Sequence, residues 1–294
     1  MMGVCAWLAA LLPAMLLASC APSPTPSPHY LLGAPYQAGG VWWYPQPNLQ
    51  LDERGLAQVY DDDHPGLTAD GEAFDQGAMA AANQTMPLPA IALVTNLENG
   101  RQVKLRINDR GPPTPRRMLA VTRRAATLLA FPSGGVARVR IQVLEADTQA
   151  AQAALPGAPD LPIAAAPRDA VEASSLAPPP GMRGSAGVAQ PGTAVDAAAA
   201  AGPAVALRLP ETLTQVAPDP GRLWIELGSF PAYEFANMQR AAVAQLGATI
   251  VSERHGRSET FQVTIGPIDD IAQADRLLDA TVAAGVSDAQ IVVR

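Results

Sequence analysis

Apolar and polar residues alternate with a period of two in two short stretches of the first half of the chain. These are residues 103–107 and 136–143, and residues 91–94 add a short apolar run. The pattern is typical of half-buried β-strands. Asn99-Gly100, between the strands expected at 91–94 and 103–107, is a strong signal for a two-residue hairpin turn. The pattern therefore predicts a β-rich region that contains an antiparallel hairpin.

A single helix interrupts these strands. It is expected at residues 122–129, where Thr122 is a good N-cap residue. Short strands at close spacing with one helix predict a small β-barrel, which we place at residues 30–146.

In the last part of the chain, residues 221–294, the pattern predicts strands that alternate with helices. Gly247 and Gly285 are natural stops for the two helices. The expected order is βαββαβ, a ferredoxin-like α+β domain with two helices on one face of a sheet. The strands are expected at residues 223–227, 249–252, 261–265 and 290–293, and the helices at 233–246 and 270–283.

Residues 147–220 separate the mainly β domain from the α+β domain. They are rich in Ala, Pro and Gly and contain no aromatic residue. Side chains this small cannot bury enough apolar area to offset the entropy of ordering the backbone. The composition predicts a flexible linker.

The N-terminus has the features of a secretory signal. Residues 1–19 form an apolar run that is short for a membrane span and ends in small residues. Leu17-Ala-Ser-Cys20 resembles the bacterial lipobox, which implies that Cys20 is diacylated and begins the mature protein. An ordinary signal peptide cleaved near Cys20 is the alternative. Residues 20–29 alternate Pro with small residues and would form an extended tether.

Composition narrows the classes of partner. The formal net charge is −7 and the pI is about 5.0, which disfavours nucleic acid and anionic lipid surfaces. The two cysteines are Cys5, within the signal, and Cys20, and the three histidines are scattered. We therefore expect no disulfide, no metal site and no cofactor.

Two carboxylates lie next to turn-forming residues. Glu72 directly follows Gly71, and Asp109 directly precedes Arg110-Gly111-Pro112. Enzymes that cleave the bond between two sugars commonly use two carboxyl groups that converge in one cleft. The alternative is that Asp109 is only a turn former and Glu72 only a solvated loop residue.

Several short motifs follow one another along the chain. Those of the first domain are Tyr30-Leu-Leu-Gly-Ala-Pro-Tyr36, Trp43-Tyr-Pro45, Gly55-Leu-Ala57, Thr68-Ala-Asp-Gly-Glu-Ala-Phe-Asp75, Val94-Thr-Asn-Leu-Glu-Asn-Gly100 and Asn108-Asp-Arg-Gly-Pro112. The C-terminal domain has Leu227-Gly-Ser-Phe230 and Val263-Thr-Ile-Gly-Pro267, through which it resembles SPOR domains. In this order the motifs resemble the rare lipoprotein A (RlpA) family, and the resemblance covers most of the chain.

The resemblance implies a double-psi β-barrel that acts as a lytic transglycosylase on peptide-free (denuded) glycan strands of peptidoglycan. The family's acids fall on Glu72 and Asp109. Its His in an Ala-Ala-His run falls on Asn83, and its second Asp falls on Ala120. His64 lies in a loop that departs from the family pattern and could replace the missing imidazole in space.

A lytic transglycosylase needs no activated water, because one acid that later acts as a base can suffice. We assign that role to Asp109, with Glu72 assisting. Asn83 could hydrogen-bond a sugar hydroxyl but cannot exchange a proton. Arg110 could orient substrate, or it could pair with Asp109 and lower the pKa of that carboxyl.

Aromatic residues suggest where glycan would bind. In the SPOR-like domain, Trp224 and Glu226 alternate away from the apolar positions and could share the sheet face free of helices with Gln262. Burial of Trp224 in a core is the alternative. Trp42, Trp43 and Tyr44 form either an aromatic clamp or an arm packed onto its own barrel, and the second reading is favoured.

The resemblance as a whole implies a lipid-anchored enzyme of the cell envelope that faces the periplasm. Ala21 after the lipidated Cys20 favours the outer membrane over the inner one by the sorting rule of enteric bacteria. Peptidoglycan and, through Cys20, the membrane are the expected partners, with enrichment and possible protein partners at the division septum. The alternative is a glycan-binding protein of the same architecture that has lost turnover at Asn83 and Ala120.

Overall fold

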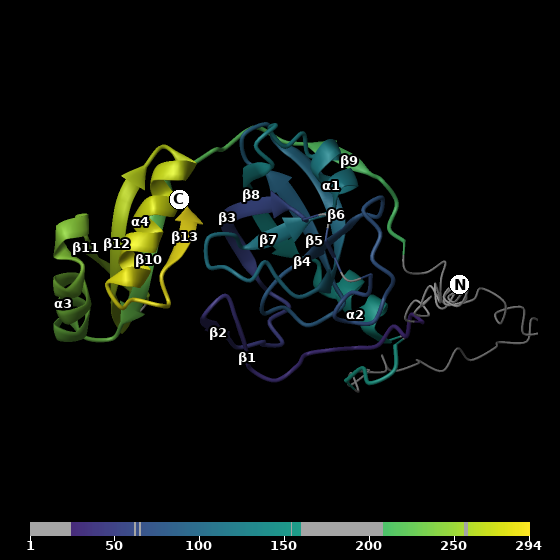
Figure 1. Cartoon of the computed structure of the whole chain (residues 1–294), viewed down its shortest axis with the longest axis horizontal. Coiled ribbons are helices and arrows are strands. Elements are labelled where there is room, and N and C mark those ends of the chain that lie inside the picture. Colours follow the sequence, from purple (N-terminus) through teal and green to yellow (C-terminus); the bar gives the residue numbers. More distant parts are fainter. Residues whose placement is uncertain (1–24, 62, 65, 154, 160–207, 256–257) are drawn as a thin grey trace, which may run out of the picture.

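The computed structural model describes residues 25–61, 63–64, 66–153, 155–159, 208–255 and 258–294. These residues form two domains that lie side by side (Figure 1). The expected signal at 1–19, Cys20 and the middle of the expected linker lie outside the described residues. Among the helices that are described, none is both long and apolar enough to span a membrane.

Six strands of the first domain close into a ring. Around the ring the order is β3-β7-β4-β6-β5-β8, and pairing of β8 with β3 completes the barrel. The pairs β3–β7 and β4–β6 are parallel, and the other four pairs are antiparallel. The expected double-psi β-barrel is confirmed. Its strands are β3 (Asp52–Val59), β4 (Ala80–Ala82), β5 (Ala90–Asn96), β6 (Arg101–Asp109), β7 (Leu119–Val121) and β8 (Val136–Val143).

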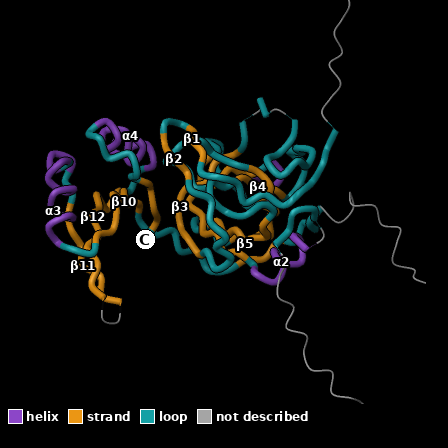
Figure 2. Tube along the Cα trace, turned by 90° about the horizontal axis from the view of Figure 1, so that it is seen from below, coloured by secondary structure: helices purple, strands orange, loops and turns teal. Residues whose placement is uncertain are grey.

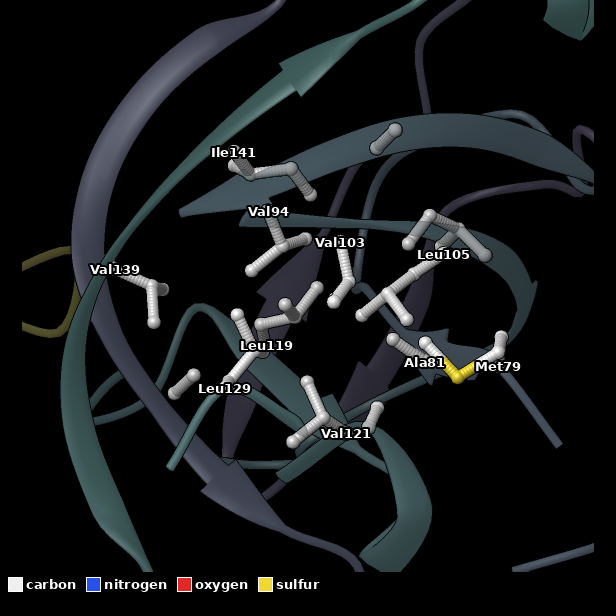
Figure 3. Close-up of a cluster of buried hydrophobic side chains, with 14 of the residues drawn as sticks. Met79, Ala81, Val94, Val103, Leu105, Leu119, Val121, Leu129, Val139 and Ile141 are labelled. Atoms are coloured by element: carbon white, nitrogen blue, oxygen red, sulfur yellow. The ribbon is translucent and has the colours of Figure 1, made fainter. Parts of the chain in front are cut away.

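The alternation along the strands fills the barrel interior. Val103 and Leu105 of β6 and Val139 and Ile141 of β8 are all fully buried, and Figure 3 shows their side chains pointing toward one another. Complete burial of a Val, Leu or Ile side chain contributes roughly 1.5–3 kcal/mol. The period of two in the sequence therefore marks the core of this domain.

The hairpin between β5 and β6 is confirmed, but its loop is longer than expected. Residues 97–100 connect the strands, and Gly100 has a φ of 76°. The side-chain oxygen of Asn96 accepts from the Glu98 N–H, and that of Asn99 accepts from the Arg101 N–H. These bonds to the backbone stabilise a four-residue loop where the Asn-Gly pair alone suggested two.

The expected helix is present as α1 (Arg123–Leu128). Thr122 is its N-cap, and its hydroxyl accepts a hydrogen bond from the Ala125 N–H at 3.3 Å. The N-cap prediction is confirmed.

The expected linker boundaries at 147 and 220 are wrong at both ends. Helix α2 (Glu145–Ala153) packs on β5, where the Thr148 hydroxyl accepts from the Ile91 N–H and Gln152 donates to the Pro89 carbonyl. At the other end, β9 (Leu213–Gln215) pairs with β6. Composition missed both segments because their polar side chains and backbone bond to the barrel, although they bring little apolar area.

The C-terminal domain has the expected βαββαβ order and is confirmed as a ferredoxin-like fold. Its sheet order is β11-β12-β10-β13, and all neighbours are antiparallel. Gly247, with a φ of 77°, ends the first helical segment in a 3₁₀ turn, η1. The elements are β10 (Leu223–Phe230), α3 (Tyr233–Ala242), η1 (Ala244–Leu246), β11 (Thr249–His255), β12 (Ser258–Ile268), α4 (Ile271–Ala283) and β13 (Gln290–Val293).

A short hairpin precedes the barrel and lies outside its ring (Figure 2). It consists of β1 (Tyr36–Ala38) and β2 (Val41–Trp43), which pair only with each other. We call this hairpin, together with Tyr44, the aromatic arm.

The two domains contact each other through complementary charge. Arg117 of the barrel donates two hydrogen bonds to the Asp275 carboxylate. Nη1 donates to Oδ1 at 2.7 Å and Nη2 donates to Oδ2 at 2.8 Å. Arg116 pairs with Asp279 beside it. A single β-bridge joins Gly55 of β3 to Val292 of β13. The barrel supplies the arginines of these pairs and the C-terminal domain supplies the carboxylates.

Candidate active site around Asp109

Asp109, the last residue of β6, carries a carboxylate that is held on both oxygens. Oδ1 accepts from the backbone N–H groups of Ala69 at 2.8 Å and Arg110 at 2.9 Å. Oδ2 accepts from the Tyr60 hydroxyl at 3.2 Å and lies 2.9 Å from His64 Nε2. The end of a strand and four contacts fix the position of this group, which acid–base chemistry requires.

His64 presents a protonated nitrogen to Asp109. The Gly66 N–H donates to His64 Nδ1 at 3.3 Å, so the neutral ring carries its proton on Nε2, the nitrogen that faces Asp109 Oδ2. The imidazole stacks on the Phe74 ring, with centroids 3.7 Å apart and planes at 15°. Of the alternatives in the sequence, a His64 that takes the place of the missing family histidine in space is the one that the geometry favours.

Tyr60 is a contact of Asp109 that the sequence reasoning did not single out. Burial, and next the nearby Asp109 charge, raise the pKa of the Tyr60 hydroxyl, which therefore remains a donor. Its ring meets Phe74 edge-on at 4.9 Å. The sequence signal that could have found it is Val59-Tyr60-Asp61, which falls on a Trp-Tyr-Gly tripeptide of the RlpA family.

Asp109 opens into a cavity of about 380 Å³. Tyr60, His64, Pro112 and Pro113 are among the residues that line it. Ala120, at the position of the family's second Asp, is also part of the wall. The cavity is large enough for sugar rings and brings Asp109 and His64 into reach of a ligand.

Glu72 does not share this cavity, so the expected convergence of two carboxylates in one cleft is wrong. Its Oε1 pairs with Arg106, with Nη2 at 2.6 Å, and its Oε2 accepts from Asn108 Nδ2 at 2.8 Å. The group lines a separate cavity of about 350 Å³. Successive side chains of a strand point to opposite faces, so Asn108 and Arg106 lie on the face away from Asp109.

Asp70 is buried beside Glu72. The pKa of the Asp70 carboxyl is raised to about 7, mainly because the group is buried away from water and secondly because the Glu72 charge repels its ionised form. Its Oδ1 accepts from the Thr68 hydroxyl at 2.7 Å. The Glu72 cavity thus holds a buried charge network rather than a free acid.

Asn83 and Arg110 do not have the roles first assigned to them. The Asn83 side chain donates to the Met118 carbonyl and accepts from the N–H groups of Thr85 and Met86, and only 3% of the residue is exposed. Burial and these bonds hold the amide against backbone groups, so the structure does not present it to a sugar as expected.

Arg110 lines the Asp109 cavity, but its guanidinium donates to backbone carbonyls, including that of Leu32 at 2.6 Å. Another is the Met86 carbonyl. Its side chain ties the segment before the aromatic arm to the barrel instead of pairing with the Asp109 carboxylate.

The sheet face expected to bind glycan in the C-terminal domain has Trp224 and Glu226 on it. Leu223 and Ile225 point into the helix-covered core, so their neighbours occupy the opposite face. A Cβ on Gly266 would lie 2.8 Å from the Trp224 ring, so glycine leaves room for the ring there. Gln262 is 9% exposed and donates to Glu226, so it positions that carboxylate more than it meets solvent.

Among the described residues, no group of three or more His, Cys, Asp or Glu side chains is arranged to hold a metal ion. Asp109 and His64, in contact beside a cavity, are groups that can carry out proton transfer.

Comparisons with known proteins agree with the barrel and its expected family. The family model described as "Lytic transglycolase", a double-psi β-barrel family, matches residues 52–141. A curated protein of Rickettsia bellii named endolytic peptidoglycan transglycosylase RlpA is 38% identical over 125 residues, which is 41% of this chain and 55% of that protein. The chain thus spans about half the length of that relative.

A longer match is the protein of the same name from Pseudomonas aeruginosa PAO1, which is 29% identical over 279 residues, 92% of this chain and 80% of the relative. Among solved structures, the RlpA SPOR domain of Pseudomonas aeruginosa covers 24% of this chain and 99% of that chain, at 20% identity. Its TM-score of 0.23 is too low to carry an argument. The expected resemblance to the RlpA family is confirmed by the sequence matches.

Proposed function

We propose that this chain is a lytic transglycosylase that cleaves peptide-free glycan strands of peptidoglycan. The observation that carries the proposal is the pairing of Asp109 Oδ2 with His64 Nε2 at 2.9 Å in the wall of a 380 Å³ cavity. Relatives named endolytic peptidoglycan transglycosylase RlpA align with the barrel that builds this cavity.

In the proposed step, Asp109 enters as the carboxylic acid, and neutral His64 donates its Nε2–H to Asp109 Oδ2. Asp109 transfers its proton to the glycosidic oxygen as the bond from that oxygen to C1 of N-acetylmuramic acid breaks. The 6-hydroxyl oxygen of the same sugar then bonds to C1, and its proton returns to Asp109. The products are an anhydro end and a free hydroxyl, and the pair regains its starting state.

Glu72 has a positioning role in this proposal. It pairs with Arg106 and Asn108 and also belongs to the loop whose Ala69 N–H donates to Asp109 Oδ1. The ion pair therefore stabilises the loop behind the reacting carboxylate without meeting the substrate itself.

We also propose that the C-terminal domain binds the same glycan through Trp224 and Glu226. Trp224 is half-buried on the sheet face away from the helices, and an aromatic ring can stack on the apolar face of a sugar. Such a domain would direct the enzyme to the denuded glycan of division septa.

The proposed location of the protein is the cell envelope, where it would face the periplasm and be anchored by a lipid at Cys20. The support is the lipobox-like Leu17-Ala-Ser-Cys20, and Ala21 favours the outer membrane. Mass spectrometry of the protein purified from membranes would detect the lipid, and a mature protein that lacks the diacyl mass would contradict it.

A second candidate is a glycan-binding protein of the same architecture without turnover. Ala120 in the wall of the Asp109 cavity favours it, because a methyl group replaces a carboxylate of the family there. Asn83 favours it also, since its buried amide is bonded to backbone groups and cannot exchange a proton.

The deciding experiment incubates the full chain with peptide-free sacculi and detects anhydro-ended sugars by mass spectrometry. The enzyme proposal expects such ends from the wild type. A wild type that binds the sacculi and releases no anhydro ends would reject turnover and leave the binding protein.

A further inference from the structure

We propose that the junction of the two domains forms a further glycan-binding groove between the aromatic arm and the loop before β13. The inference rests on the proposed function for its choice of ligand, a peptide-free strand of linked amino sugars. The groove is separate from the Asp109 cavity and has a volume of about 320 Å³.

The aromatic arm supplies two exposed rings. Trp42 is 55% exposed and Tyr44 is 58% exposed. They are two positions apart along an extended segment, so their side chains leave it on the same side. Exposed rings in one groove are costly to leave in water and are suited to stack on the apolar faces of sugar rings.

The rings are presented on a rigid support. Trp43 Nε1 donates to the Ala38 carbonyl at 3.3 Å and ties the two strands of the hairpin together. The turn of the hairpin packs so closely on the barrel that a Cβ on Gly39 would lie 1.8 Å from the Pro113 carbonyl oxygen. A preorganised aromatic surface loses less entropy when it binds a ligand.

The opposite wall of the groove is polar and belongs to the other domain. Ser287, Asp288 and Gln290 line it. Their hydroxyl, carboxylate and amide groups can hydrogen-bond sugar hydroxyls and acetamido groups. Rings on one side and hydrogen-bonding groups on the other match a neutral carbohydrate better than an apolar peptide or an anionic partner.

The groove joins the two glycan-contacting sites already proposed. Gln290 is directly opposite Glu226 in the β10–β13 pair, so the groove continues the sheet face of the C-terminal domain. On the other side, Pro115 lines the groove while Pro112 and Pro113 line the Asp109 cavity. One glycan strand could thus run from the sheet face through the groove to the reacting carboxylate.

The groove exists only while the domains are docked, because each domain contributes one wall. The docking contact with the best geometry is Arg117 with Asp275, a two-point ion pair whose side chains are 10% and 22% exposed. Its loss should open the groove without touching either wall.

The test measures binding of purified peptide-free glycan fragments to the full chain by titration calorimetry. An Asp109→Asn background prevents cleavage during the titration. The double variant Trp42→Ala/Tyr44→Ala should weaken binding about tenfold, the loss expected from removal of two stacking rings. The matched control Tyr233→Ala/Phe235→Ala removes two rings of similar exposure from α3 and should bind like its parent.

A second pair of variants tests the contact between the two domains. Arg117→Glu should weaken binding, and Arg117→Glu/Asp275→Arg should restore most of it by reversing the ion pair. Unchanged affinity of the Trp42→Ala/Tyr44→Ala variant, folded by circular dichroism, would overturn the groove. Equal loss in the α3 control would overturn it too.

Failure of the groove and failure of the enzyme proposal are distinguishable. The groove is judged by affinity in the Asp109→Asn background, whereas turnover is judged by anhydro ends from the unmodified chain. Tenfold weaker binding without any turnover by the wild type supports the groove and rejects the enzyme.

Discussion

Two buried carboxylates on either side of one strand have different surroundings. Asp109 meets a titratable imidazole, a hydroxyl and two backbone N–H groups, and it faces a cavity. Glu72 meets a guanidinium and an amide on the other face of β6. Asp109 thus faces a ligand-sized cavity beside an imidazole, while Glu72 is tied into an ion pair with Arg106. The two carboxylates are similarly buried, so their partners and not their burial distinguish the roles that we propose for them.

The largest expected difference between the two is in turnover. Asp109→Asn removes the proton-transfer group and should lower the rate about 10²- to 10⁴-fold, the usual contribution of general acid–base catalysis. The release of anhydro-ended sugars measures the rate. Asp147→Asn, at an exposed carboxylate that pairs with Lys104, is the matched control and should keep the wild-type rate.

The next largest effect is on stability, on the other face of β6. Glu72→Ala leaves the Arg106 guanidinium buried without its partner and should cost about 3–5 kcal/mol in the free energy of unfolding. Urea unfolding measures it. The control Asp52→Ala breaks the more exposed pair with Arg140 and should cost about 0–1 kcal/mol. Equal losses in the two variants would argue against a special role for the Glu72 network.

Asp70 gives the Glu72 side a pH dependence. Its pKa is about 7 when folded and near its ordinary value of 3.8 when unfolded. The folded state therefore holds this proton between about pH 4 and pH 7 while the unfolded state has released it. Its contribution is most favourable below pH 4 and is lost as the pH rises to 7, a change on the order of a few kcal/mol.

Asp70→Asn should abolish that part of the pH dependence. The measurement is the free energy of unfolding of wild type and variant at several values between pH 4 and pH 8. We expect the difference between the two proteins to change in favour of the variant as the pH rises. A difference that stays constant over this range would contradict a raised pKa.

The smallest effect is expected at His64. His64→Gln keeps a side chain that can hydrogen-bond Asp109 but removes its ability to take up a proton, so turnover should fall about 10- to 100-fold, or roughly 1.4–2.8 kcal/mol. A merely structural His64 would lower the folded fraction and leave kcat per folded molecule unchanged. In this account kcat per folded molecule falls.

The fold could be predicted from local patterns far better than the site could. Alternation placed β6 and β8 and an apolar run placed β5, whereas β3, β4 and β7 were not located. Thr122 marked the start of α1, and the βαββαβ order of the C-terminal domain followed from periodicity and Gly247. Those features depend on neighbours in sequence. The segments missed at both ends of the linker depend on hydrogen bonds to strands that are distant in sequence, such as those of Thr148 with Ile91 and of β9 with β6.

The site residues show the same limit more sharply. Glu72 and Asp109 looked equivalent because both lie beside turns, yet the face of β6 that each uses depends on the register of the barrel. Asn83 looked like a ligand-binding amide. Its hydrogen-bond partners are the Thr85 N–H in the same loop and the carbonyl of Met118, directly before β7. His64 was only one alternative in the sequence, and the folded loop brings it within 2.9 Å of Asp109.

The comparison between the two carboxylates has one direct test, the turnover of Glu72→Gln beside that of Asp109→Asn. Both changes keep the shape of the side chain and remove its charge, and the rate is expressed per folded molecule. The account predicts that Glu72→Gln loses less than about tenfold and that Asp109→Asn loses at least about 100-fold. Equal, large losses in two folded variants would contradict it and make Glu72 a reacting group.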